Sequence, residues 1–385
     1  MLPLVFALST MATGPGPYHL AAGDLNGDGF PDLAAPCRGE LLSPAERRPA
    51  NDTVTVYLTR GSPQWVERKD LKTGFGPYTA AIADLDGDNR NDLAVVNFQA
   101  NDGRNLSIFW GPLTGQAQHV RVEGGPFDYD KNRTKGGDPV YPTPGLTSVA
   151  AVDANRDGRM DLVAVAWSSD FFVLLENLGE RRFRQRRFPL PPGPRDVAVA
   201  DFDGDGVMDL AFSIYSANLV EVWRGDGKGS FAKAHTFHSQ GHVPYHLKAT
   251  DIDGDGKPDL IVGNRGPSDN IVLFRNEGSS FRFGGSFGTA TERRGEATVD
   301  EIRDVLVHDF DGDGIPDLLA ACHVSHKVVL WRGTREKAFG RAFSQAREWT
   351  FPGKGPRALV ATGVGVAIAM FDANELAIIP KPQRP

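Results

Sequence analysis

Cysteine is scarce in this sequence, which contains only Cys37 and Cys322 among its 385 residues. Two cysteines cannot form the disulfide framework that holds many small extracellular domains together. The chain is also long enough to bury a large hydrophobic core without such links. We therefore expect both cysteines to be unpaired, small and buried side chains.

Long apolar runs are missing as well. No stretch approaches the roughly 20 apolar residues that a membrane-spanning helix needs, so we expect no membrane span. The apolar opening MLPLVFALST lacks the basic leader and the small-residue cleavage site of a secretion signal. Catalytic signatures such as Gly-x-Ser-x-Gly, the Walker loop and His-Glu-x-x-His are also missing. Their absence favours a binding protein over an enzyme without excluding catalysis.

Glycine and proline, in contrast, are abundant. The chain has 44 glycines and 27 prolines, and 40% of its residues are hydrophobic. This composition is too rich in turns for a helical protein, and it predicts an all-β fold.

One nine-residue pattern, D-x-[DN]-x-D-[GN]-x-x-D, occurs six times. Its copies begin at Asp24, Asp84, Asp153, Asp201, Asp251 and Asp309, so that successive starts are 60, 69, 48, 50 and 58 residues apart. An apolar alternating run precedes each copy and a second apolar run follows it, which indicates a strand, a tight loop and a strand. A third apolar run and a fourth, more polar run complete each unit. Four strands in 48 to 69 residues are typical of one β-propeller blade.

The units begin near residues 18, 78, 146, 195, 245 and 303, and a degenerate seventh unit without the acidic loop spans residues 355–380. Residues 1–13 stand where the fourth strand of a unit stands, so we expect them to form the outer strand of the last blade. The prediction is a single domain over residues 1–385, a seven-bladed β-propeller with four-stranded antiparallel blades. The N-terminal strand would close it by joining the C-terminal blade. Cys37 and Cys322 would lie in separate blades, too far apart to pair.

The acidic loops are predicted to bind Ca²⁺. Carboxylate and amide oxygens at alternate positions of a tight loop converge on one point, and Ca²⁺ prefers six to eight hard oxygen ligands. Positions 1, 3, 5 and 9 would supply side chains, and position 7, which shares no side-chain chemistry, would supply its backbone carbonyl. The predicted ligands are Asp24, Asn26, Asp28, Phe30 and Asp32; Asp84, Asp86, Asp88, Arg90 and Asp92; Asp153, Asn155, Asp157, Arg159 and Asp161; Asp201, Asp203, Asp205, Val207 and Asp209; Asp251, Asp253, Asp255, Lys257 and Asp259; and Asp309, Asp311, Asp313, Ile315 and Asp317.

About six structural Ca²⁺ ions would turn the formal net charge of -7 positive, which favours an anionic partner.

Glycine at position 6 allows a left-handed turn, and Asn89 is the one exception. Asn26 and Asn155 lower the charge of the first and third loops, so we expect these two to bind Ca²⁺ more weakly. The alternative is an acidic turn that stays solvated, which six copies disfavour. An EF-hand is excluded, because its acidic position twelve is Ala35 in the first copy.

The D-x-D-x-D-G-x-x-D loops between paired strands resemble the FG-GAP/VCBS repeat family, which occurs in integrin α-chain heads and in many secreted bacterial and fungal proteins. The resemblance covers nearly the whole chain; only the seventh unit and Asn89 depart from the pattern. It implies a calcium-binding propeller whose loops join the first two strands of each blade on the lower face. Relatives include adhesion receptors, fungal lectins and polysaccharide lyases, so the resemblance does not decide the function.

The opposite, upper face is the predicted recognition face. The long insertions at 37–52, 97–105, 124–147, 263–270 and 284–303 would lie there, and long loops on one rim are typical of recognition. The starts of the inner strands would surround the mouth of a central channel. The candidate ligand-binding residues are His19, Tyr78, Arg195, Tyr245, His246, Arg303, His323 and Arg357. Arginine grips carboxylates and sulfates, and aromatic rings stack on sugars. The alternative is that Gly-Pro-Tyr and Gly-Pro-Arg are turn and packing residues of the repeat.

The leading hypothesis is a calcium-stabilised, non-catalytic binding module for a carbohydrate or protein, with an anionic ligand favoured. The alternative is a polysaccharide lyase or hydrolase that uses His19, Tyr245, His246, Arg303 or His323. A scaffolding role in a larger complex is a third hypothesis. We expect a monomer with no nucleic-acid partner, in an extracellular or periplasmic place, because weak Ca²⁺ sites fill only where the ion is plentiful.

Overall fold

The computed structural model describes residues 9–39, 51–100, 102–123, 134–135, 138–139, 144–266, 270–289, 292–293, 296–297, 300–334 and 343–382. The predicted outer strand at residues 1–13 is therefore described only from Ser9 onward. Large parts of the predicted upper-face insertions, including residues 40–50 and 124–133, lie outside the described residues.

The chain forms an all-β fold of four-stranded antiparallel sheets, most of them built from consecutive strands. They are β2 (Ala21–Gly23), β3 (Asp32–Cys37), β4 (Thr53–Thr59) and β5 (Trp65–Lys72); β6 (Pro77–Ala83), β7 (Asp92–Asn97), β8 (Leu106–Phe109) and β9 (Gln118–Val120); β12 (Leu146–Val152), β13 (Asp161–Ala166), β14 (Phe171–Asn177) and β15 (Phe183–Pro189); and β16 (Pro194–Ala200), β17 (Asp209–Ile214), β18 (Leu219–Gly225) and β19 (Phe231–His238).

Two further sets of four strands are linked to each other. They are β20 (His242–Thr250), β21 (Asp259–Gly266), β22 (Ile271–Asn276) and β23 (Phe281–Phe287), and β26 (Asp300–His308), β27 (Asp317–Cys322), β28 (Lys327–Gly333) and β29 (Phe343–Thr350). A short pairing of β21 with β26 joins them. The remaining elements are the hairpins β10 (Thr134–Lys135) with β11 (Asp138–Pro139) and β24 (Glu292–Arg293) with β25 (Glu296–Ala297), and the 3-10 helix η2 (Phe371–Ala373).

The two ends of the chain share a sheet. β30 (Pro356–Thr362), β31 (Gly365–Met370) and β32 (Glu375–Pro380) are followed in that sheet by β1 (Ser9–Ala12) at its outer edge. Ser9 pairs with Ile378 and Ala12 pairs with Glu375. β1 is therefore the outermost strand of the sheet that the C-terminal strands form.

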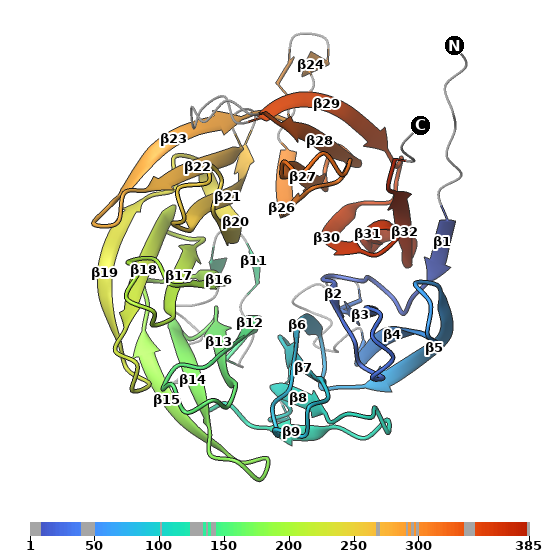
Figure 1. The fold of residues 1–385 in the computed structure, drawn as a ribbon, viewed down its shortest axis with the longest axis vertical. Coiled ribbons are helices and arrows are strands. Elements are labelled where there is room, and N and C mark those ends of the chain that lie inside the picture. Colours follow the sequence, from blue (N-terminus) through green and yellow to red (C-terminus); the bar gives the residue numbers. More distant parts are fainter. Residues whose placement is uncertain are drawn as a thin grey trace.

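The sheets stand around a common centre, with the first strand of each nearest the centre and the fourth at the rim (Figure 1). Each inner strand contacts the inner strand of the next sheet, and β2 contacts both β6 and β30. The sheets thus cover one another's faces in a propeller-like arrangement. Within the described ranges, no helix is long and apolar enough to cross a membrane.

The core lies between neighbouring sheets. Every residue of β3, β7, β13, β17, β27 and β31 is buried, as is expected of strands covered on both faces. Phe172 shows how the sheets interlock, because its ring packs against Phe188 of its own sheet and Phe212 of the next, at centroid distances of 4.6 and 4.7 Å. Outer strands such as β5 alternate between half-buried and exposed residues. Cys37 and Cys322 are buried and free, as predicted.

A bulge near the start of the inner strands determines which side chains face the centre. The strand register skips one residue in six of them, leaving the extra residues Tyr78, Thr147, Arg195, Tyr245, Arg303 and Arg357. A β-bulge re-aims side chains locally, so two consecutive residues can face the same side. Each extra residue and a neighbour can therefore both point toward the centre.

Candidate functional site

The six acidic loops join the first and second strands of their sheets and share one backbone conformation. Position 6 is left-handed in all of them, and Asn89, with φ of 65°, adopts the conformation that glycine adopts elsewhere. Position 4 is left-handed as well, which the sequence analysis did not predict. Five loops have glycine at position 4, whereas the third has Arg156 with φ of 61°. Both positions need a residue that tolerates this conformation.

The aspartate at position 9 is buried in every loop and anchors it. In the fourth loop, the Asp209 carboxylate accepts the backbone N–H of Phe202 at 3.0 Å and that of Gly225 at 2.9 Å, so it ties the loop to the end of β18. The equivalent aspartates make the same two kinds of contact. Burial raises the pKa of Asp209 to about 6, because the charged carboxylate is poorly solvated there. A cation bound beside it would offset that penalty.

Four loops bring three carboxylate oxygens within 4.8 Å of one another. The groups are Asp84, Asp86 and Asp92; Asp201, Asp203 and Asp209; Asp251, Asp253 and Asp255; and Asp309, Asp311 and Asp317. Backbone N–H groups hold position 1 in place, since Asp201 accepts from Gly204 and Gly206, each at 2.8 Å. Converging carboxylates on a rigid turn are a donor set that fits Ca²⁺. Among the described residues, the first and third loops form no such group.

Arginines lie against the position 3 carboxylates of four loops; in the second loop, Arg181 lies 2.7 Å from Asp86. Arg224, Arg275 and Arg332 each follow an aromatic residue on the third strand of their sheet. Their guanidinium nitrogens lie 3.0, 2.9 and 3.1 Å from carboxylate oxygens of Asp203, Asp253 and Asp311. The negative charge of these loops is thus partly balanced by the protein itself.

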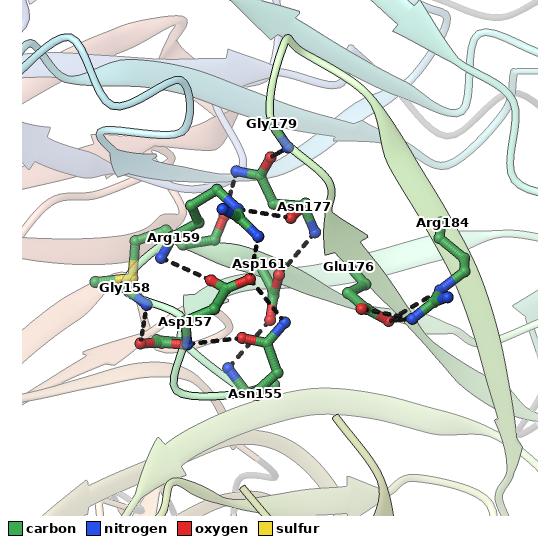
Figure 2. Close-up of polar contacts among 12 residues, drawn as sticks. Asn155, Asp157, Gly158, Arg159, Asp161, Glu176, Asn177, Gly179 and Arg184 are labelled. Atoms are coloured by element: carbon green, nitrogen blue, oxygen red, sulfur yellow. Dashed lines mark hydrogen bonds and ion pairs between the residues drawn. The ribbon is translucent and has the colours of Figure 1, made fainter. Parts of the chain in front are cut away.

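The third loop carries its own cation (Figure 2). The guanidinium of Arg159, at position 7, pairs with Asp157 of the same loop, and its Nε donates to the Asn177 carbonyl at 3.1 Å. The side-chain amide of Asn155 also donates to Asp157, at 3.1 Å. The position 5 carboxylate, a predicted metal ligand, is therefore engaged by two protein groups. Arg90 holds position 7 of the second loop, and the described contacts include no ion pair between it and Asp88.

A pocket opens at the centre, at the other end of the inner strands. It is lined by Tyr18, His19, Tyr78, Thr79, Thr147, Arg195, Asp196, Tyr245, His246, Arg303, Asp304, Arg357 and Ala358, and its volume is about 60 Å³. In β16 the pocket residue Arg195 and the loop residue Asp201 are six positions apart. A strand rises by about 3.3 Å per residue, so the pocket and the acidic loops lie roughly 20 Å apart.

The outer layer of the pocket consists of arginines stacked on tyrosines. The Arg303 guanidinium lies 3.8 Å from the centroid of the Tyr245 ring, and that of Arg357 lies 4.3 Å from the Tyr18 ring. Arg195 donates to the hydroxyl of Tyr18 at 2.9 Å and also contacts that of Tyr78. Guanidinium groups over aromatic faces make favourable cation–π contacts, which help to keep these charges buried.

Tyr18 is the most strongly perturbed group of this layer. Its hydroxyl lies 2.5 Å from that of Tyr78. Burial alone would raise the pKa of Tyr18, but the guanidinium groups of Arg357, Arg195, Arg303 and Arg38 lower it to about 6. Tyr78 shows the opposite shift, because burial raises its pKa. Near neutral pH, Tyr18 is therefore the internal anion of the arginine layer.

The inner layer is a hydrogen-bonded network across neighbouring strands. His246 lies between two carboxylates, with Nδ1 2.8 Å from Asp196 and Nε2 2.9 Å from Asp304. Asp196 also accepts from the Ser148 hydroxyl at 2.6 Å, and Asp304 accepts from the Leu359 N–H at 2.8 Å. The network thus runs from β12 to β30. Burial lowers the pKa of His246, but Asp304 and Asp196 outweigh it and raise the pKa to about 9, so the imidazole is charged at neutral pH.

The structure brings together most of the candidate ligand-binding residues. His19, Tyr78, Arg195, Tyr245, His246, Arg303 and Arg357 line the one pocket. His323 lies beside it, with Nε2 3.4 Å from Arg357. Burial and the Arg357 charge lower the pKa of His323 to about 2, and burial lowers that of His19 to about 4, so both are neutral.

Thr147 of the pocket lining and Arg38, which lies beside the pocket, were not predicted. Thr147 occupies the bulge of β12, at the place where Arg195 stands in β16, and alignment of the repeats could have found it. Arg38 follows β3 and lies over the rings of Tyr18 and Tyr78 at 5.2 and 5.1 Å. No repeat signal marks Arg38, because it belongs to a connection that differs from blade to blade.

Known structures of similar shape show the fold. A chain in the crystal structure of BBS1N in complex with ARL6DN is 13% identical with a TM-score of 0.62, over 98% of this chain and 97% of that chain. Virginiamycin B lyase from Staphylococcus aureus is 10% identical with a TM-score of 0.60, over 97% and 98%. The periplasmic gluconolactonase PpgL of Pseudomonas aeruginosa is 19% identical with a TM-score of 0.56, over 86% and 85%. These likenesses concern the propeller-like fold alone.

Sequence comparisons identify the repeat. Cartilage acidic protein 1 of Xenopus tropicalis is 31% identical over 131 residues, which are 30% of this chain and 20% of that protein, and the human protein is 30% identical over the same length. The chain thus matches about a fifth of the length of these relatives. The FG-GAP-like repeat matches residues 153–212, 211–262 and 251–320, and the FG-GAP repeat matches residues 16–36. The matched segments include five of the six acidic loops, and these parts of the chain belong to the FG-GAP repeat family.

Proposed function

We propose that this protein is a binding module for a carbohydrate or protein ligand, built as a seven-bladed β-propeller and stabilised by Ca²⁺. The observation that carries the proposal is the central pocket, which gathers arginine, tyrosine and histidine from the starts of the inner strands of six sheets. Residues far apart in the sequence thus converge on one opening. Such a concave site with convergent polar groups is the usual form of a ligand site.

The seven-bladed architecture is supported by the strand pairings. The strands fall into sets of four, β1 completes the set of β30 to β32, and each inner strand contacts the next around the centre. Residues 1–385 would then form one domain. In a ring of this kind every blade shields its neighbours, so unfolding of one blade exposes two others.

Calcium has a structural role in this proposal, because the acidic loops lie roughly 20 Å from the pocket. The strength of each site should follow the charge of position 3. Two exchanges test this. Asp203→Asn gives the fourth loop the residue of the first, and Asn26→Asp makes the reverse change.

The measurements are the number of Ca²⁺ ions bound per chain and the thermal unfolding temperature with and without chelator. We expect several bound ions in the wild type and a large fall in unfolding temperature on chelation. Asp203→Asn should weaken one site by about tenfold, and Asn26→Asp should strengthen one, since each changes the ligand charge by one. A protein that binds no metal and unfolds at the same temperature in chelator would refute the calcium assignment.

Ligand binding itself is tested by screening glycans and extracellular proteins against the wild type. The matched variant is Arg303→Gln, which alters the pocket without touching the acidic loops. We expect ligands that bind the wild type and lose affinity for the variant. Ligands that bind both equally would place recognition elsewhere.

An extracellular or periplasmic place is part of the proposal, since the Ca²⁺ loops need plentiful ion and the similar cartilage proteins carry a name that points outside the cell.

A polysaccharide lyase or hydrolase is the second candidate, and one observation favours it. Tyr18, with its lowered pKa, and the surrounding arginines are groups that could remove a proton beside a carboxylate and neutralise the charge. His246 is a poor base, because both of its nitrogens face carboxylates. Turnover of uronic-acid polymers that is lost in Tyr18→Phe would establish catalysis. Tight binding of such a polymer without turnover would exclude it.

A further inference from the structure

The arginines of the pocket are deeply buried, and two of them have unused hydrogen-bond donors. Arg357 is only 5% exposed, and its Nε and Nη1 have no hydrogen-bond partner among the described residues. The Nε of Arg303 also has none there, although its Nη2 pairs with Glu301. A buried charged donor without an acceptor costs free energy, so such donors call for an acceptor from outside the chain.

The inner layer cannot supply that acceptor. The carboxylates of Asp196 and Asp304 already flank the charged His246 and accept further N–H and O–H groups. The counter-charges of the outer layer are Tyr18, which is anionic near neutral pH, and Glu301, which also pairs with the exposed Arg265 at 3.2 Å. Arg357 has no carboxylate partner among the described residues. The outer layer thus carries more arginines than counter-charges.

The size and the walls of the pocket restrict what can enter it. Its volume is about 60 Å³, and since one water needs roughly 10–15 Å³ on the same measure, there is room for about four to six atoms of that size. A sugar ring does not fit in that space. The tyrosine faces are also covered, by Arg303 on Tyr245 and by Arg357 on Tyr18, so they are not free to stack on a sugar. A single small polar group fits better.

We infer that the pocket binds one oxyanion, a carboxylate, sulfate or phosphate group, which accepts hydrogen bonds from Arg303 and Arg357. Guanidinium groups bind such groups through paired, charge-assisted N–H···O bonds. The inference rests on the proposed function and names the part of the ligand that enters the pocket. The remainder of the ligand lies outside, over the rim.

The test uses sodium sulfate and sodium acetate as probes and the full chain with Ca²⁺ present. Binding is measured by isothermal titration and by the thermal unfolding temperature, against sodium chloride at equal ionic strength. Concentrations stay below about 20 mM, because concentrated sulfate stabilises most proteins without a specific site. The variants are Arg357→Gln, Arg357→Lys and the control Arg60→Gln, which changes an exposed arginine directly after β4 that does not line the pocket.

We expect one of the two anions to bind the wild type and the control with equal affinity. Arg357→Gln should lose about tenfold or more of that affinity, the amount expected for a charge-assisted hydrogen bond, and Arg357→Lys should recover part of it. If Arg357→Gln does not fold, Arg303→Gln provides the same comparison. No anion effect in the wild type, or an equal effect in the wild type and Arg357→Gln, would overturn the inference.

The outcome is distinguishable from failure of the proposed function. Suppose that a glycan or protein binds the wild type and loses affinity for Arg303→Gln, but that sulfate and acetate do not bind. That result would overturn the inference of an oxyanion site and leave the proposed function standing. Anion binding that is lost in Arg357→Gln, with acetate or sulfate preferred, supports the inference and indicates which acidic group the ligand carries.

Discussion

Replacement of His246 by glutamine is the sharpest test of the inner layer. The imidazole lies between the buried carboxylates of Asp196 and Asp304, 2.8 and 2.9 Å away. Glutamine can donate one hydrogen bond to one of them but carries no charge. The substitution therefore leaves two buried carboxylates without a cation.

Two arguments give the size of the effect. Removal of one partner from a buried ion pair costs about 3–5 kcal/mol of folding free energy. Independently, the pKa of His246 rises from 6.5 to about 9 on folding, which corresponds to about 3 kcal/mol. We therefore expect His246→Gln to lower the free energy of unfolding by about 3 kcal/mol near pH 6.5.

The pH dependence identifies the charge as the cause. Because folding raises the pKa of His246, its contribution is complete below pH 6.5 and is lost as the pH rises through about 9. The difference in stability between the wild type and His246→Gln should therefore shrink between pH 6.5 and 9.5. Comparing the two proteins at each pH cancels the contribution of Tyr18, whose lowered pKa makes stability rise with pH from about 6 toward 10.

The assay is urea unfolding followed by tryptophan fluorescence at both pH values, with His242→Gln as the control. His242 is an exposed residue on the same strand, so its substitution should have little effect. An equal loss of stability at pH 6.5 and 9.5, or a loss below about 1 kcal/mol at pH 6.5, would refute a charged His246 bridge.

Two further predictions concern the arginines. Arg159→Ala should increase the number of Ca²⁺ ions bound at submillimolar calcium by one, because it frees the Asp157 carboxylate. Arg90→Ala, the control at the same position of the second loop, should leave the number unchanged. Equal numbers of bound ions in the two variants would contradict the role of Arg159. The affinity of the pocket for anions should fall by up to about tenfold per pH unit above pH 6. The reason is that Tyr18 loses its proton and its negative charge offsets part of the positive charge of Arg357, Arg195, Arg303 and Arg38. Tyr18→Phe should abolish this pH dependence. His323, His19 and His246, with pKa values of about 2, 4 and 9, do not titrate between pH 5.5 and 7.5, so a dependence that persists in Tyr18→Phe would refute the role of Tyr18.

Much of the strand architecture was predictable because the repeat marks it. The acidic pattern lies between the first and second strands of each unit, and apolar alternation marks the others, so β16, β17 and β18 follow directly from the residues around Asp201 and Asp209. The expectation of an N-terminal strand in the last unit had the same basis, since that unit was one strand short. The left-handed position 4 was not predicted, although five of the six loops have glycine there.

The candidate site was predictable only in part. The bulge residues recur after Gly-Pro or its equivalent, which pointed to Tyr78, Arg195 and Arg357. Contacts between blades carry no such signal. Nothing in the sequence places His246 between two carboxylates or Arg38 over Tyr18.

The repeat, the all-β class and the oxygen-rich loops depend on residues close together in the chain, so local patterns reveal them: alternation sets the strand faces, and nine consecutive positions form each loop. The chemistry of the centre depends instead on contacts between distant parts of the chain. There, residues as distant as Tyr18, Arg195 and Arg357 share one small, poorly solvated volume. Their charges shift one another's pKa values and leave unused donors on Arg357, which no local pattern can reveal.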